Sequence, residues 1–406
     1  MTKRARWPLF LCGFVLCCGL GRAQLVLGQY LDEAPVGTWN AFGPSGAASD
    51  GMAGLRFTLT QDASAVFSNP ALLTGLPRFT VAVGGSFASS EFYRYAIVNT
   101  GILSTTGNVS LDIFALDSIA LSVRLGGWAL GLGYGLQETY GRPGVDIGSN
   151  YYSLFFDQSG KLNVLNLSLA RSLGGRFSLG VGINFVTGDF EKITEDTLDF
   201  GLTVVSSSVS QKYSGLFVTA GLTFDITRSL RLAAVVRTPY VKKAESRSAF
   251  SLDTQSGPHI LIEGESDSDE YRQPLVAGLG LSYSFNERWR LAGELAYVGW
   301  SSYRVTYFGE PQTRDFRDIL KAGLGVEYTL SANLFGSDMR LPLRVGLSLD
   351  PQPMKDPRST YVSLALGSGI RGKIGFLDLA VAAGRESGSG QNLTVKKITA
   401  TLGLTI

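Results

Sequence analysis

Strict alternation of residue types, repeated along most of the chain, limits how this sequence can fold more than any other feature. One set of alternating positions carries Leu, Val, Ile and aromatic residues, and the other carries mainly Gly, Ser and Asn, as in 127–137 and 275–285. A period of two predicts β-strands with two unlike faces. A soluble β-sandwich would also alternate, but its solvent face would carry many more Lys and Glu residues. An apolar face opposite a glycine-rich one is typical of a transmembrane antiparallel β-barrel, whose closed sheet leaves no unpaired edge in lipid.

Breaks in the alternation divide the chain into fourteen expected strands, an even number as in bacterial single-chain barrels. Tight turns alternate with longer polar connections, of which 191–211 and 246–270 are the longest, and this order places both chain ends in the periplasm. The tenth connection, 331–340, is longer than that rule predicts and suggests a short periplasmic helix. The expected strands are 79–91, 109–125, 127–140, 150–172, 176–190, 212–226, 229–245, 271–285, 288–307, 314–330, 341–350, 359–371, 373–386 and 392–406.

The first 23 residues predict export. Lys3, Arg4 and Arg6 precede an apolar run that is shorter than the roughly 20 residues a transmembrane helix needs, and a cleavage position follows near Ala23. An uncleaved anchor is the alternative. All three cysteines lie in this segment, so the exported chain would form no disulfide. Loss of the segment's four basic residues takes the formal net charge from +2 to about −2, which gives no electrostatic reason for nucleic-acid binding.

Residues 24–76 fall outside the strand pattern. Small residues dominate this stretch, and few of its side chains are charged. A fourteen-strand barrel is wide enough that side chains alone do not fill its interior, and backbone rich in small residues can pack close to a glycine-lined wall. The residues that give the stretch a recognisable character are Gly51, Met52, Gly54, Asp62, Ala63, Ser64, Asn69, Pro70 and Ala71.

This stretch resembles the segment after the signal peptide in FadL-type outer-membrane transporters (the OmpP1/FadL/TodX superfamily) and in the related PorV-like and UPF0164-like barrels. The resemblance implies a hatch folded into the lumen. It also implies entry of ligand from outside, an apolar pocket, and sideways exit through a gap in the wall. Two departures are Leu72-Leu73 in place of Gly-Leu and a terminal Ile406 in place of an aromatic residue. The second leaves open how the barrel-assembly machinery reads the chain end.

We therefore expect a signal peptide at 1–23, a hatch at 24–76 and a lipid-embedded barrel at 77–406 in the bacterial outer membrane. A purely structural role in assembly is the alternative for the hatch. Some charged residues are expected on the inner face, where they could pair with each other, with the hatch or with a ligand carboxylate, and pairing with the hatch is favoured. These residues are Arg124, Arg290, Glu294, Lys321, Glu327, Arg344 and Asp378.

Catalytic and metal-binding patterns are missing. His259 is the single histidine and falls in an expected external loop, so we expect no cofactor, no transition-metal site and no enzyme. The acidic stretch 263–270 is expected to be a solvated loop, with binding of Ca²⁺ or lipopolysaccharide-bridging cations as the alternative. The favoured function is uptake of hydrophobic small molecules such as long-chain fatty acids. The alternative is a PorV-like protein partner in secretion or surface attachment, and a simple diffusion porin comes third.

Overall fold

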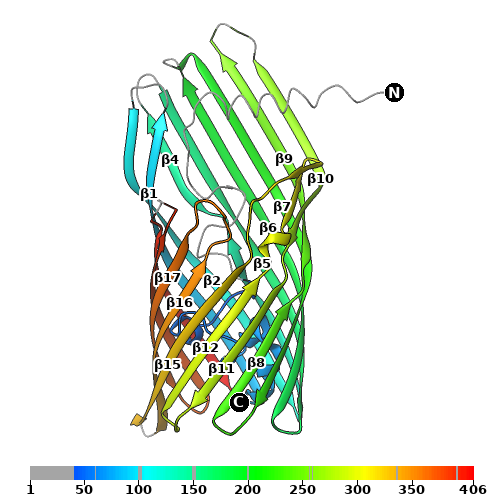
Figure 1. Ribbon diagram of the computed structural model, residues 1–406, viewed down its shortest axis with the longest axis vertical. Coiled ribbons are helices and arrows are strands. Elements are labelled where there is room, and N and C mark those ends of the chain that lie inside the picture. The colour runs from blue at the N-terminus through cyan, green and yellow to red at the C-terminus, as the bar shows by residue number, and fades with distance from the viewer. Residues whose placement is uncertain are drawn as a thin grey trace, which may run out of the picture.

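The computed structural model describes residues 41–59, 61–98, 103–148, 152–198, 201–255, 257, 259–334, 337–389 and 392–406. Its strands form one antiparallel sheet, and β1 pairs with β19, so the sheet closes into a barrel (Figure 1). No helix within the described ranges is long and apolar enough to cross a membrane. The all-β barrel expected from the alternation is confirmed.

The barrel has fourteen strands, and five of them are interrupted once, which gives nineteen strand segments. The expected number of strands is therefore confirmed. The segments are β1 (Phe79–Val98), β2 (Leu103–Leu125), β3 (Trp128–Thr139) with β4 (Arg142–Gly148), β5 (Tyr152–Leu173), β6 (Phe177–Leu198), β7 (Thr203–Asp225), β8 (Leu230–Arg237) with β9 (Tyr240–Thr254), β10 (Ile260–Gln273) with β11 (Val276–Ser284), β12 (Trp289–Val298) with β13 (Arg304–Tyr307), β14 (Glu310–Gln312) with β15 (Ile319–Leu334), β16 (Ser337–Pro351), β17 (Thr360–Arg371), β18 (Gly375–Ser387) and β19 (Thr394–Thr405).

The prediction of two long loops, at 191–211 and 246–270, is wrong. Most of 191–211 and 246–270 is strand, because the β6–β7 ladder continues to Leu198↔Thr203 and the β9–β10 ladder to Leu252↔Ile260. The acidic stretch therefore lies in β10, and His259 lies in a short turn beside Asp253. Strands β5, β6, β7, β9 and β10 rise far above the β15–β18 side of the barrel, as do β4 and the upper parts of β1 and β2 (Figure 1). There Ser, Thr and charged residues outnumber apolar ones, so the contrast between the faces that reveals the lower strands is weak.

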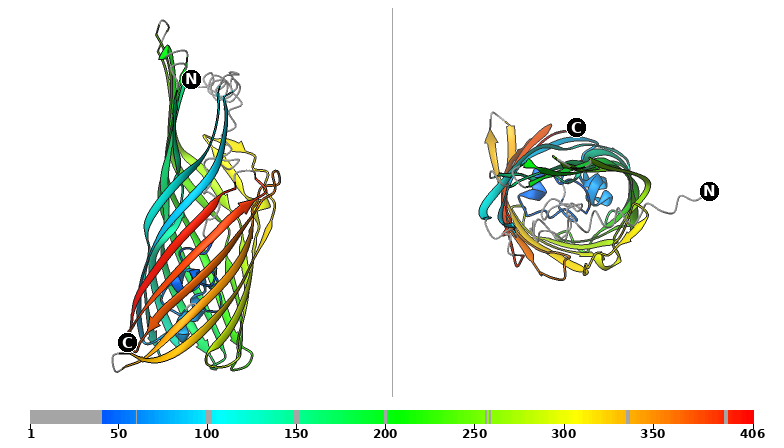
Figure 2. Two further views of the ribbon diagram at one scale, coloured as in Figure 1. Left: turned by 90° about the vertical axis from the view of Figure 1, so that its left-hand side faces the viewer. Right: turned by 90° about the horizontal axis from the view of Figure 1, so that it is seen from above.

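The expected helix at 331–340 is also wrong. β15 continues to Leu334 and pairs directly with Ser337 at the start of β16, so a tight hairpin replaces the helix. This hairpin lies at the same end of the barrel as the C-terminus and the other tight turns (Figure 2). Because the tenth connection is a tight hairpin, long and short connections alternate more regularly than the sequence suggested.

Side chains follow the expected division between the two faces of the sheet. On β3, Leu130 and Leu132 are exposed on the outside, whereas Ala129 is buried. Inside the ring of strands lies the stretch 41–76, which we call the luminal segment (Figure 2). It contains α2 (Ala47–Asp50), α3 (Ala65–Ser68) and the 3-10 helix η1 (Pro70–Gly75).

Glycine on the inner face makes room for the luminal segment. A Cβ atom at Gly180 would come within 2.5 Å of the Pro70 carbonyl carbon, and one at Gly133 within 2.6 Å of both Val66 and Phe67. The backbone of the segment thus packs directly on the backbone of the wall.

Replacing an inner glycine should therefore destabilise the barrel more than replacing an outer one. We expect Gly180→Ala to lower the free energy of unfolding by about 1–3 kcal/mol, the usual range for overpacking. Gly293 faces outward, and its Cβ would come no closer than 3.7 Å to a neighbouring atom. Gly293→Ala should change stability by less than about 0.5 kcal/mol. Guanidinium unfolding in lipid vesicles measures both, and equal midpoints would refute close packing at Gly180.

Candidate functional site

The end of the luminal segment is bonded to the wall through Asn69. This fully buried side chain donates from Nδ2 to the carbonyl of Phe57 at 2.8 Å and to that of Leu222 in β7 at 3.3 Å. Its oxygen accepts from the Ala71 amide at 3.1 Å, and Pro70 begins η1. The Asn-Pro-Ala part of the motif thereby joins two stretches of the segment to β7.

The other motif residues shape the segment itself. Asp62 is buried and accepts from the Ser64 amide at 2.8 Å, which fixes the turn before α3, and Ala63 is fully buried within it. Met52 packs over inner glycines of β15 and β16, and Gly54 has a positive φ of 88° that favours glycine. Gly51 lies against the backbone of Gly367, where a side chain has no room.

Glu294 is the predicted inner-face charge that contacts the luminal segment most extensively. Its carboxylate accepts backbone N–H groups from Arg56 at 2.9 Å, Phe57 at 2.6 Å and Thr58 at 3.3 Å. Glu294 lies on β12 and is buried. Three amides on one carboxylate hold the middle of the segment against this wall.

Four other predicted charges pair with each other across the wall. Arg290 lies 3.4 Å from Glu327, which lies 2.8 Å from Arg344, and Arg344 in turn lies 2.8 Å from Asp378. Arg371, which the sequence reading missed, completes this chain by pairing with Asp378 and donating to the Gln61 carbonyl at 3.3 Å. Arg371 is the last residue of β17 and of the expected strand 359–371, and the alternation along that strand places it on the inner face.

Asp50 forms a second contact between segment and wall that the sequence did not reveal. Its carboxylate lies 2.9 Å from the Lys397 ammonium and accepts from Thr399 at 2.7 Å and from Ser45 at 2.5 Å. Burial alone would raise the pKa of Asp50, but Lys397 and the two hydroxyls outweigh burial and hold that pKa below its usual value.

A cavity of about 280 Å³ separates this part of the segment from β11, β12 and β15–β19. Predicted residue Lys321 lines it and lies 2.7 Å from Asp350. The cavity is bordered by charges of both signs as well as by Phe42, Leu55 and Val298, so it is not a continuous apolar pocket. The last predicted charge, Arg124, is exposed at the end of β2. Among the described residues, no group of His, Cys, Asp or Glu side chains could hold a metal ion.

The barrel wall is not uniformly hydrogen-bonded. β2 and β3 pair only from Leu125↔Trp128 up to Ser118↔Gly135. Above that point the described part of β2 pairs with β1 alone, and β3 and β4 pair with β5. We call this unpaired boundary, between 103–117 and 136–148, the seam. Both strands carry a β-bulge where they part, at Asp117 and at Gln137.

Side chains cover the seam where backbone pairing ends. Leu111 and Ile113 of β2 approach the position of a Cβ on Gly141 to 3.5 and 3.9 Å. On the outside of the same strand, Phe114 is 84% exposed and Leu116 is 60% exposed. The seam is thus bordered by apolar groups and is closed without a backbone ladder.

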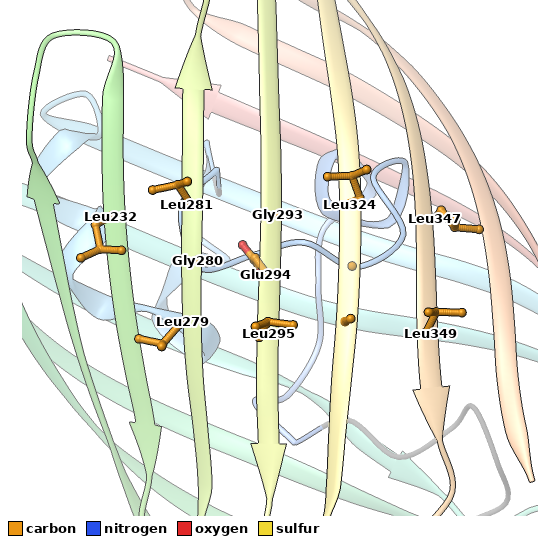
Figure 3. Close-up of a pocket in the computed structure, with 12 residues that line it drawn as sticks. Leu232, Leu279, Gly280, Leu281, Gly293, Glu294, Leu295, Leu324, Leu347 and Leu349 are labelled. Carbon is orange, nitrogen blue, oxygen red and sulfur yellow. The ribbon is translucent and has the colours of Figure 1, made fainter.

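An apolar hollow of about 410 Å³ lies elsewhere on the outer face, around Gly293 (Figure 3). Leucines from five strands surround it, and it shares the wall residues Glu294 and Gly323 with the inner cavity. The β12–β15 ladder between them is continuous from Trp289↔Tyr328 to Val298↔Ile319. The hollow therefore does not lead through the wall, in contrast to the seam.

Comparisons with known proteins bear on this architecture. A family model described as outer membrane protein transport protein (OMPP1/FadL/TodX) matches residues 38–362. A FadL homologue from Pseudomonas aeruginosa is 16% identical with a TM-score of 0.64, and the match covers 89% of this chain and 97% of that one. The toluene transporters TodX of Pseudomonas putida and TbuX of Ralstonia pickettii are 17% and 19% identical, with TM-scores of 0.63 and 0.62, and each match covers 90% of this chain and 98% of theirs. These likenesses show a shared fold, and no curated protein matches the sequence.

Removing the Glu294 carboxylate should loosen the luminal segment. Glu294→Ala leaves three buried amides without their acceptor, at a cost of about 1–3 kcal/mol for each group that stays unsatisfied. We expect the amides of Phe57 and Thr58 to exchange hydrogen faster, while Glu294→Gln, which keeps one acceptor oxygen, has a smaller effect. Glu287→Ala, in an exposed turn, is the control. Unchanged exchange in Glu294→Ala would show that the carboxylate does not hold the segment.

Proposed function

We propose a route for hydrophobic molecules through this protein, which belongs to the outer membrane transport family OMPP1/FadL/TodX. The family's outer-membrane barrels transport hydrophobic substrates. In our proposal, residues 1–23 are a signal peptide cleaved near Ala23, 24–76 are a hatch, and 77–406 are the barrel. The molecule enters at the tall end of the barrel, and the periplasmic side is the end with the tight turns.

The seam is the observation that carries this proposal. Transfer of a hydrophobic molecule from water into lipid lowers its free energy, whereas a water-filled path does not. Between β2 and β3–β4 it would cross a boundary of apolar side chains without breaking a backbone ladder. The wall behind the outer hollow, by contrast, keeps a continuous β12–β15 ladder.

The hatch closes the direct path along the barrel axis. The Asn69, Glu294 and Asp50 contacts hold it against three different parts of the wall. Glycine-to-backbone packing at Gly180 and Gly367 leaves no room for a ligand there. A molecule arriving from the tall end is therefore directed sideways.

The substrate class in this proposal includes long-chain fatty acids and aromatic hydrocarbons. Two of the similar structures are described as toluene transporters. A fatty acid would also need a partner for its carboxylate, and Arg56, Lys321 and Lys397 are the cations beside the inner cavity. Because Lys321 and Lys397 already pair with carboxylates, a fatty acid would have to compete with Asp350 or Asp50.

A role as a PorV-like protein partner is the second candidate. The one-sided sheet formed by β5–β7, β9 and β10 favours it, because this sheet rises above the barrel and exposes Ile193 and Leu261. A pull-down with mild detergent distinguishes the two functions. Recovery of a large secretion barrel or its cargo would support the partner role, and recovery of this chain alone would count against it.

Direct binding is the first test of the transport function. Purified full-length barrel should bind oleate or toluene saturably, and a complete lack of saturable binding for both would refute the proposal.

Locking the seam tests the exit route. The exported chain is expected to carry no cysteine, so Ile113→Cys with Gly141→Cys introduces a single pair, at positions where Ile113 Cδ1 lies 3.9 Å from a Cβ on Gly141. Oxidation should reduce uptake of a labelled substrate into lipid vesicles by about tenfold or more, since a disulfide limits its Cα atoms to a separation of about 4.4–6.8 Å. A reductant should restore uptake. Each single-cysteine variant serves as a control, and full uptake through the oxidised pair would contradict lateral exit.

A further inference from the structure

A row of buried contacts lines the inner face of the barrel from β3 to β9, beside the seam. Tyr140 follows β3 and is fully buried. Its hydroxyl donates to Glu138 Oε2 at 2.8 Å and accepts from Lys242 Nζ at 2.6 Å. Lys242 belongs to β9, and β5, β6 and β7 stand between β3 and β9 in the wall. The contact therefore spans the inner face of these strands, where the Tyr140 ring packs 5.7 Å from Phe190 and 5.6 Å from Tyr213.

The lysine is held in place by aromatic rings. Its ammonium lies 4.4 Å from the ring centre of Tyr213, 4.8 Å from that of Tyr271 and 4.9 Å from that of Tyr140, and the residue is 3% exposed. Gln211 fixes the outer two rings through hydrogen bonds with their hydroxyls at 2.7 and 2.9 Å. A desolvated cation over several rings is strongly attracted to them, so Lys242 is a firm anchor on β9.

The near end of this row is shaped by the bulge at Gln137. A bulge turns two successive side chains to the same face of a strand. Gln137 and Glu138 are accordingly both buried inside the barrel, at 1% and 3% exposure. Glu138 is thereby placed to accept from Tyr140. The next residue, Gly141, is the one that Leu111 and Ile113 cover in the seam.

An unpaired strand edge at the membrane needs a cause. Backbone N–H and C=O groups left unpaired in hydrocarbon are costly, so two neighbouring strands pair unless something holds them apart. The ladder between β2 and β3 ends at Gly135, shortly before Tyr140, while β3 stays bonded to β5 as far as Thr139↔Lys161. The Tyr140 carbonyl also accepts from Gln158 of β5 at 2.8 Å, so β3 and the edge of β5 move together.

We propose that Glu138, Tyr140 and Lys242 form a strut that pulls β3 into the lumen, away from β2, and so keeps the seam free of backbone hydrogen bonds. These are positioning residues, because they act through the strands. Their importance for transport rests on the proposed function, but their effect on the seam does not. Without the strut, β3 would move toward β2 and the ladder would continue past Ser118↔Gly135.

Hydrogen exchange in the full-length barrel in lipid vesicles, without ligand, tests the strut. Lys242→Met keeps a long unbranched side chain without the ammonium, and Tyr140→Phe keeps the ring without the hydroxyl. In both variants the amides of 111–117 should exchange about tenfold more slowly, the factor by which one net backbone hydrogen bond shifts local opening. Lys243→Met, at the adjacent exposed residue, is the matched control and should exchange as the unmodified protein does.

Uptake measured on the same variants separates this inference from the proposed function. Slower exchange together with reduced uptake supports both. Slower exchange in a protein that takes up no hydrophobic molecule supports the strut and refutes the function. Unchanged exchange in both Lys242→Met and Tyr140→Phe, with the barrel still folded, overturns the strut whatever uptake shows. Lys242→Arg, which keeps the cation, should retain fast exchange, and slow exchange there would also count against the inference.

Discussion

The structure depends on one constraint, the need of every backbone N–H and C=O group in hydrocarbon to find a partner. Closure of β1 on β19 meets that need around the barrel. It also explains why the outer face can be almost wholly apolar while the inner face is left to glycine and small polar residues. The luminal segment uses this inner space, since its backbone approaches the wall where side chains are missing, as at Gly180 and Gly367.

The seam is a local exception to the same constraint, because β2 and β3 do not pair with each other there. The two bulges at Asp117 and Gln137 stand where the ladder stops, and the apolar side chains of Leu111 and Ile113 replace backbone bonds above them. Beside it, Tyr140 links β3 to Lys242 of β9 on the inner face. The outer hollow at Gly293 shows the opposite case, in which a surface depression overlies an intact ladder.

The sequence predicted the barrel because the two faces of a lipid-embedded strand differ strongly in residue type. The sequence did not reveal the upper parts of β6, β7, β9 and β10 as strands. Ser, Thr and charged residues are common on both faces there, so the two faces hardly differ in residue type. The alternation of inward and outward positions along each strand correctly placed Glu294 and Arg344 on the inner face. The alternation could not place Lys242 on the inner face, because the break at 238–239 between β8 and β9 shifts by one residue which positions face inward. Contacts between the non-adjacent strands β3 and β9 depend on the shape of the closed barrel, and a local sequence pattern does not predict that shape.

Lateral exit means that hydrophobic molecules leave the barrel through the seam. Photolabelling tests it most directly, with a long-chain alkyl probe that carries a diazirine and is added to the tall side of barrels in lipid vesicles. If molecules pass through the seam, labelled peptides should include 111–116 and 136–141, and an excess of unlabelled oleate or toluene should suppress the label. Label confined to the opposite end of the lumen, around Gln61 and Arg371, would contradict it, because the molecule would then pass along the barrel axis.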